Sequence, residues 1–105
     1  TTWCVPCKKE MSSLEKLSQV YPEIIIYPIN LEKPDKDKTS KFFKDLNISK
    51  LNIYFDPEFL LVKLFNMRGV PTSILIDKNG KEFARIIGEV DFFDESFIDF
   101  LKKYL

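Results

Sequence analysis

The sequence predicts a single α/β domain in which a mixed central sheet is flanked by helices on both faces. Three observations lead to this fold class: apolar residues at helical spacing after Pro6, two β-rich runs around Asn79-Gly80, and helical connections between the strands. With 105 residues, of which 45% are hydrophobic and 30% charged, the chain has room for one modest core. We therefore assign residues 1–105 to one domain.

The first half of the chain is expected to begin with a helix over residues 5–20, because its apolar residues recur at helical spacing and Pro22 ends the run. The β-branched run "EIIIYPIN" (23–30) is typical of a buried strand. The polar segment 31–40 is expected to be a solvated loop, and "SKFFKDLN" (40–47) a short helix. The segment "LNIYFD" (51–56) fits either a short strand or an extended link.

The second half is expected to contain a helix over 57–66, with Leu61, Leu64 and Phe65 facing inward. The segment 68–88 contains Asn79-Gly80 between two β-rich runs, which is the strongest short signal for a hairpin. Residues 91–105 carry acidic residues early and lysines late, an order that suits the dipole of a closing helix. Helical crossovers imply parallel strands, and the hairpin adds an antiparallel edge.

The charge balance argues against two classes of partner. The chain has 16 basic and 16 acidic residues, so nucleic acid and anionic membrane surfaces are not expected partners. The longest apolar run, residues 24–29, is too short to cross a bilayer. Because the sequence begins at Thr1 without a Met or a signal-peptide pattern, we expect a trimmed piece of a longer product, with any targeting or anchor segment upstream.

The two cysteines, Cys4 and Cys7, allow three interpretations. A closed zinc site needs four ligands, and this chain has no His and no further Cys. A structural disulfide closing so small a loop would contribute only about 2 kcal/mol. A redox-active dithiol fits best, because C-x-x-C beside a βα pattern is a specific signal for thiol-disulfide exchange.

The positions of the two thiols give each of them a chemical role in the redox interpretation. Cys4 lies at the expected helix N-terminus, where unpaired N–H groups and the dipole stabilise a thiolate. Cys7, one turn further along the same side, is placed to attack a mixed disulfide and release the partner.

The motifs "WCVPC", "KKE" and "GVPTSILIDKNG" resemble the thioredoxin superfamily, and within it the TlpA-type (TlpA/ResA-like) thiol-disulfide oxidoreductases. The resemblance covers nearly the whole chain. It implies a thioredoxin-like fold and a monomeric periplasmic domain, anchored to the inner membrane by an upstream segment, that reduces disulfides in partner proteins without a cofactor or metal. Implied partners are copper-site proteins of cytochrome oxidase assembly or apocytochromes.

The resemblance also assigns roles to individual residues. Cys4 matches the exposed nucleophile, and Cys7 the buried resolving thiol. Trp3 matches an aromatic residue that packs beside the motif, and simple core filling is compatible with this. Pro71 matches a cis-proline that lies against the cysteines, and the backbone of Val70 would then meet an extended partner strand.

Three further residues complete the expected site. Val5 and Pro6, between the cysteines, are expected to contact the substrate. Glu10 matches an acidic residue that ResA-type members place after the second cysteine, where a carboxylate would raise the thiol pKa or relay its proton. An exposed helix Glu paired with a Lys is an equally good interpretation of Glu10.

The resemblance implies that the first central strand is missing from this sequence. Family members enter the motif from a central parallel strand, and this chain has only Thr1, Thr2 and Trp3 before Cys4. The strands "EIIIYPIN" and "TSILID" are therefore expected to flank an absent strand and not to pair with each other.

The direction of electron flow is expected to be reductive. The Val5-Pro6 pair contributes no cation, and Pro6 removes one N–H donor near Cys4, so the thiolate is stabilised less than in a strong oxidant. The alternatives are a thiol oxidase or disulfide isomerase of the same fold, and a cytoplasmic thioredoxin. A Sco-type copper chaperone fits poorly, since such proteins use C-x-x-x-C with a distant His.

Overall fold

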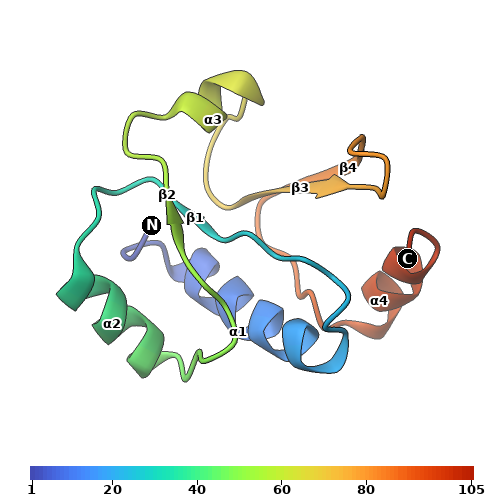
Figure 1. Cartoon of the computed structure of the whole chain (residues 1–105), viewed down its shortest axis with the longest axis horizontal. Helices are drawn as coiled ribbons and strands as arrows, with labels where there is room; N and C mark the ends of the chain where they lie inside the picture. The colour runs from blue at the N-terminus through green and yellow to red at the C-terminus, as the bar shows by residue number, and fades with distance from the viewer.

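The computed structural model describes all residues 1–105 and contains four helices and four strands (Figure 1). The elements follow one another in the order α1 (Val5–Val20), β1 (Ile29–Asn30), α2 (Lys36–Asp45), β2 (Tyr54–Phe55), α3 (Leu60–Leu64), β3 (Thr72–Ile76), β4 (Glu82–Ile87) and α4 (Glu95–Lys102). The predicted α/β class is confirmed.

The strands form two small sheets. β1 and β2 pair in parallel, joined by the helical crossover α2, and β3 and β4 pair as an antiparallel hairpin. As expected, β1 and β3 are not hydrogen-bonded to each other. Figure 1 shows α1 crossing below both sheets, with α2 to one side and α4 to the other.

The helix α1 spans the predicted residues 5–20 and provides the centre of the core. Leu17 on its inner face is only 2% exposed. Apart from Cys4, the other buried apolar side chains come from two connections: Ile48 and Leu51 lie between α2 and β2, and Phe92 lies between β4 and α4. The core therefore lies where these two connections pack on α1.

Two expectations for the region between the sheets were wrong. The segment predicted as a solvated loop contains the start of α2, because the Asp35 carboxylate caps that helix by accepting from the Lys38 N–H at 3.1 Å. The expected helix over 57–66 is reduced to α3, and Leu64, expected to face inward, is 75% exposed. A five-residue helix has little more than one turn, so it cannot bury a full apolar stripe.

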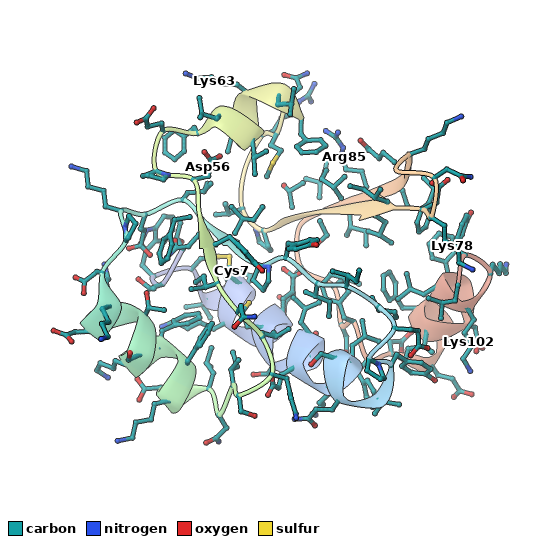
Figure 2. All side chains as sticks on the ribbon, viewed as in Figure 1. Cys7, Asp56, Lys63, Lys78, Arg85 and Lys102 are labelled. Atoms are coloured by element: carbon teal, nitrogen blue, oxygen red, sulfur yellow. A yellow bond between two sulfur atoms is a disulfide. The ribbon has the colours of Figure 1, made fainter.

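A buried aspartate fixes the start of α3. The carboxylate oxygens of Asp56 accept from the N–H groups of Leu60 and Leu61, both at 2.9 Å. Asp56 directly follows β2, which settles the ambiguous segment 51–56 as a short strand. Figure 2 shows Asp56 below α3 and Arg85 on the hairpin beside it. The guanidinium of Arg85 donates to the Phe65 carbonyl and so joins β4 to the end of α3.

The hairpin forms around Asn79-Gly80 as predicted. The Asp77 carboxylate accepts from the N–H groups of Asn79 and Lys81, and Gly80 adopts φ +79°, which favours glycine. The register runs from Thr72 opposite Ile87 to Ile76 opposite Glu82, with an irregularity after Leu75.

The hairpin packs on α4 through aromatic rings. The rings of Phe83 and Tyr104 stack with centroids 3.8 Å apart, and Phe100 lies 6.0 Å from Phe83. The helix is shorter than the predicted 91–105, because Asp94 caps it by accepting from the Phe97 N–H.

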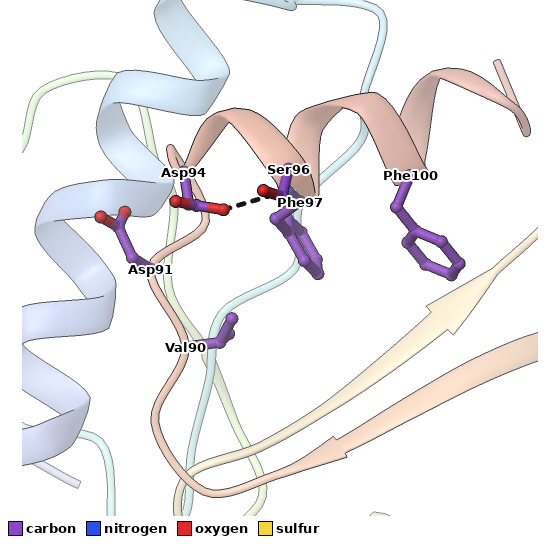
Figure 3. Close-up of a pocket in the computed structure, with 6 residues that line it drawn as sticks. All are labelled: Val90, Asp91, Asp94, Ser96, Phe97 and Phe100. Atoms are coloured by element: carbon purple, nitrogen blue, oxygen red, sulfur yellow. Dashed lines mark hydrogen bonds between the residues drawn. The ribbon is translucent and has the colours of Figure 1, made fainter.

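An open hollow of about 440 Å³ lies at the capped end of α4, lined by Val90, Asp91, Asp94, Ser96, Phe97 and Phe100 (Figure 3). None of the predicted site residues lines this hollow.

Candidate active site

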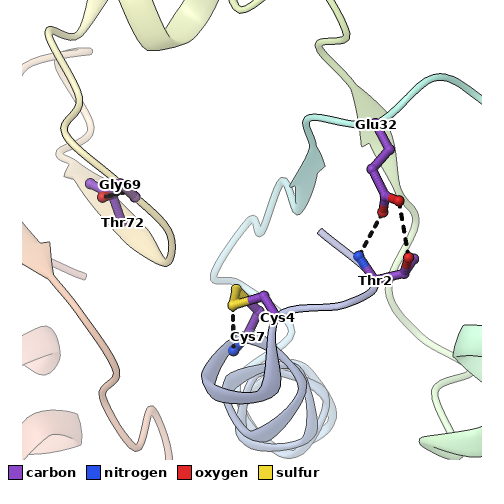
Figure 4. The surroundings of a disulfide bond; sticks show 6 residues. All are labelled: Thr2, Cys4, Cys7, Glu32, Gly69 and Thr72. Atoms are coloured by element: carbon purple, nitrogen blue, oxygen red, sulfur yellow. Dashed lines mark hydrogen bonds between the residues drawn. A yellow bond between two sulfur atoms is a disulfide. The ribbon is translucent and has the colours of Figure 1, made fainter.

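The two cysteines lie at the N-terminus of α1 and are joined in a disulfide (Figure 4). Cys4 is the N-cap residue, and its Sγ accepts from the Cys7 N–H at 3.2 Å. Pro6 lies in the first turn and carries no N–H, so the Cys7 N–H is the donor that this turn directs at the Cys4 sulfur. The predicted cap position of Cys4 is confirmed.

The relative exposure of the two cysteines is the reverse of the expectation. Cys4 is 4% exposed, whereas Cys7 is half-buried. The expectation of an exposed Cys4 and a buried Cys7 is therefore wrong for this oxidised form. Cys4 is the cap residue, and its side chain points back over the first turn of the helix. The roles of nucleophile and resolving thiol stay predictions.

The segment before Cys4 is fixed by Glu32, a residue that belongs to no motif and was not selected from the sequence. The Thr2 N–H donates to one carboxylate oxygen of Glu32 at 2.6 Å, and the Thr2 hydroxyl donates to the other at 3.1 Å. The hydrogen bond from Lys38 lowers the pKa of Glu32 to about 2, against the opposing effect of burial and with help from Thr2. This contact joins the approach to Cys4 to the residues after β1 (Figure 4).

The Val70-Pro71 peptide bond is cis, as the resemblance predicts. It directly precedes β3, and the Thr72 hydroxyl donates to the Gly69 carbonyl at 2.6 Å across the proline. Figure 4 shows this loop on one side of the disulfide and Glu32 on the other. The contact of the Pro71 ring with the sulfurs stays a prediction.

Apolar side chains near the cysteines are open to solvent. Trp3 is 69% exposed, so the interpretation of Trp3 as core filling is wrong. Val5 and Pro6 are also exposed, and Val70 is partly so. These four residues, predicted to contact the substrate, are thus accessible to another polypeptide. Their role in binding stays a prediction.

Glu10 lies on the buried side of α1, one turn beyond Cys7. It is 4% exposed and forms no ion pair, so the interpretation of Glu10 as an exposed residue paired with a Lys is wrong. Burial, and secondarily the charge of Glu89, raise the pKa of Glu10 to about 7, although the Val90 N–H and the Ser73 hydroxyl oppose the rise. A carboxyl group that titrates near neutral pH can both accept and return a proton.

The neighbours of Glu10 bring the second motif towards the first. Ser73 is in β3, two residues after Pro71, and Val90 follows β4. Neither Ser73 nor Val90 was selected from the sequence, because neither belongs to a motif.

Comparison with known proteins agrees with this geometry. The family model of the thioredoxin-like domain matches residues 1–104. The chain belongs to the thioredoxin-like family. The chain is also similar to the thiol-disulfide oxidoreductase ResA of Bacillus thuringiensis subsp. konkukian (strain 97-27), with 34% identity over 102 residues that cover 97% of this chain and 58% of that protein. The TlpA/ResA-type resemblance is thereby confirmed.

Two solved structures share the thioredoxin-like fold. A thiol:disulfide interchange protein DsbE from Chlorobium tepidum matches with a TM-score of 0.82 at 24% identity, over 98% of this chain and 73% of that one. StoA from Bacillus subtilis matches with a TM-score of 0.73 at 23% identity, over 98% and 75%. The chain spans about half the length of the curated relatives it matches. None of its helices combines the length and hydrophobicity needed to cross a membrane.

Proposed function

We propose that this thioredoxin-like domain is a protein-disulfide reductase that acts outside the cytoplasm through Cys4 and Cys7. The observation that carries the proposal is the cap geometry, in which the first turn of α1 directs the Cys7 N–H at the Cys4 sulfur. A donor in that position stabilises a thiolate more than a thiol, and the thiolate is the nucleophile in exchange reactions.

The reaction would proceed in two steps of exchange. The Cys4 thiolate attacks one sulfur of the partner's disulfide, which forms a mixed disulfide and releases the first partner thiolate. Cys7 then gives its proton to the Glu10 carboxylate and attacks the Cys4 sulfur. That attack forms the Cys4–Cys7 disulfide and releases the second partner thiolate, so two electrons pass to the partner and its two thiolates take up protons.

The exposed apolar residues provide a surface on which a partner polypeptide can lie. Trp3 and Val5 flank Cys4 and are exposed, and Val70 precedes the cis peptide bond. An extended segment could pair with the backbone at Val70 while its own cysteine meets Cys4. Recognition of this kind selects accessible, locally unfolded disulfides.

The partners are proposed from similarity alone. ResA, which this chain resembles, is named a thiol-disulfide oxidoreductase. We infer that the partners of this chain are disulfide-bonded proteins in the assembly of copper sites or cytochromes. We also infer a periplasmic location, with an anchor to the inner membrane in the full-length product. Protease accessibility of the full-length product in spheroplasts tests the location.

The reductase proposal can be tested with insulin as a general disulfide substrate. The reduced chain, without other reductants, should generate two insulin thiols for each Cys4–Cys7 pair that becomes oxidised. The variant Cys7→Ser should accumulate a mixed disulfide through Cys4, whereas the matched variant Cys4→Ser should not. Absence of insulin thiols, or equal trapping by both variants, would overturn the proposal.

A further inference from the structure

A short turn in front of α1 carries Trp3. The Cys4 N–H donates to the Thr1 carbonyl at 3.3 Å, so residues 1–4 form a turn with Thr2 and Trp3 at its centre. The Trp3 side chain is 69% exposed, and Trp3 is the only tryptophan in the chain. Tryptophan is enriched among the residues that dominate the binding energy of protein interfaces. The direction in which this turn presents Trp3 therefore bears on any partner that reaches Cys4.

Glu32 holds the centre of this turn. The Thr2 N–H donates to Oε1 of Glu32 at 2.6 Å, and the Thr2 hydroxyl donates to Oε2 at 3.1 Å (Figure 4). Both donors of Thr2 thus meet one carboxylate, whose side chain is only 19% exposed. Two hydrogen bonds from one residue to one carboxylate fix its direction as well as its position.

The Glu32 carboxylate is itself held from β1 and α2. The Glu32 N–H donates to the side-chain oxygen of Asn30 at 3.0 Å, and Asn30, which ends β1, is 5% exposed. The Lys38 ammonium, from α2, donates to Oε2 of Glu32 at 2.8 Å. A continuous set of hydrogen bonds therefore runs from the buried end of β1 to the turn before Cys4.

We propose that Glu32 is a positioning residue for the redox reaction, which fixes the turn of residues 1–4 so that Trp3 is presented beside Cys4 to a partner polypeptide. The inference rests on the proposed function and adds a residue that lies outside both sequence motifs. Its physical basis is preorganisation. An exposed side chain on a free segment loses conformational freedom when a partner binds, and this loss weakens binding. On a fixed turn, much of that freedom is already absent in the free protein.

The reactivity of the Cys4 sulfur should depend much less on Glu32. The N–H that donates to this sulfur belongs to Cys7, within the first turn of α1. Loss of Glu32 should therefore slow exchange with a protein disulfide more than it slows the reaction of Cys4 with a small reagent. That difference separates positioning of Trp3 from a general effect on the thiolate.

The first test uses the fluorescence of Trp3 in the oxidised chain, where no other tryptophan contributes. Motions of free loops and chain ends occur in nanoseconds and longer, within reach of time-resolved anisotropy. In Glu32→Ala the amplitude of the nanosecond component should rise by about twofold or more. An unchanged amplitude in Glu32→Ala would overturn the proposal.

Matched variants separate the contact with Thr2 from the loss of a charge. Glu32→Gln keeps an oxygen that can accept from the Thr2 N–H, so its anisotropy decay should stay close to that of the parent. Asp45→Ala breaks the exposed Lys41–Asp45 ion pair of α2, which has no contact with the turn, and should change nothing. If Glu32→Ala does not fold, Thr2→Val removes only the hydroxyl donor and should show the same effects at smaller size.

The second test compares two reactions of the reduced chain. In Glu32→Ala the rate constant for reduction of insulin should fall by about threefold to tenfold, the factor that corresponds to ordering one side chain. The rate constant for alkylation of Cys4 by iodoacetamide should stay within about twofold of the parent value, because it needs only the thiolate. An equal fall in both rate constants would place the effect on the thiolate and overturn the proposal.

A double-mutant cycle connects Glu32 to Trp3. Trp3→Ala should also slow the reduction of insulin, and Glu32→Ala should add little in the Trp3→Ala background, because the side chain to be positioned is gone. Independent, additive losses would overturn the link between the two residues. If the parent chain does not reduce insulin, the proposed function fails, and the anisotropy of Trp3 then decides by itself whether Glu32 holds the turn.

Discussion

The backbone N–H of Cys7 lies 3.2 Å from the sulfur of Cys4 and donates a hydrogen bond to it. The first turn of α1 thus favours a negative charge on the first cysteine of the pair. Solvent exposure instead favours reaction at Cys7, because Cys7 is the more accessible of the two cysteines in the oxidised form. The two effects lead to different expectations for which thiol reacts first.

We predict that Cys4 is the reactive thiol in the reduced chain. An ordinary cysteine is only about 3% thiolate at pH 7, so lowering its pKa by one unit raises the reactive fraction about eightfold. Modest differences in exposure do not offset a factor of that size. Limiting iodoacetamide at pH 7, followed by peptide mapping, should label Cys4 first. Preferential labelling of Cys7 would show that access governs reactivity here.

We predict a reducing potential, nearer to thioredoxin's value of about −270 mV than to DsbA's of about −120 mV. Pro6 supplies neither an N–H nor a charge to the Cys4 thiolate. Pro6→His adds both and should raise the potential by about 30 mV or more, whereas Pro6→Ala adds only the N–H and should raise it less. A glutathione redox titration measures all three proteins. A parent value close to that of DsbA would instead indicate an oxidase.

A third prediction concerns Glu15, which joins α1 to the residues after α2. Its carboxylate accepts from the Ser49 N–H at 2.8 Å and from the Lys50 N–H at 3.0 Å. Burial alone would raise the pKa of Glu15, but these donors outweigh it and the net pKa is lowered. Glu15→Gln should therefore reduce the free energy of unfolding at pH 7 by about 1–2 kcal/mol.

The pH dependence provides the control for Glu15. Because the folded-state pKa is lowered, the stabilisation is present above pH 4.5, the ordinary value, and is lost as pH falls through the folded pKa. In urea unfolding, the difference in free energy of unfolding between the parent chain and Glu15→Gln should become smaller at acid pH. Glu58→Gln, at an exposed position, should change stability by less than about 0.5 kcal/mol. An equal loss in both variants would contradict the role of Glu15.

Features that depend on near neighbours in the chain could be predicted from the sequence. The cap at Cys4 and the hairpin at Asn79-Gly80 each depend on residues within one turn, and both are confirmed. The start of α2 also had a local signal, since Asp35 after Pro34 is a typical N-cap, but the charged composition of the segment concealed it. The cis bond before Pro71 could be expected only from the resemblance, because trans is the commoner form.

Features that depend on distant contacts could not be predicted. Glu10 is buried because the segment around Phe92, 79 residues beyond Ser13, packs on α1. Periodicity along α1 gives no information about which segment covers it. Leu64 shows the converse, since an apolar residue at helical spacing is left exposed where no element covers it.

The last prediction concerns stability and the Glu10 carboxyl. Its pKa is raised to about 7 in the folded chain, against an ordinary value of 4.5. A raised folded-state pKa means that the stabilising contribution is complete below pH 4.5 and is lost as pH rises through 7. Allowing for screening by solvent, the loss should be about 1–2 kcal/mol. Glu10→Gln stays neutral, so the oxidised variant should match the parent at pH 4 and exceed its stability by that amount at pH 8. Urea unfolding at several pH values measures both proteins, and curves that stay parallel from pH 4 to pH 8 would show that Glu10 titrates as an ordinary carboxyl.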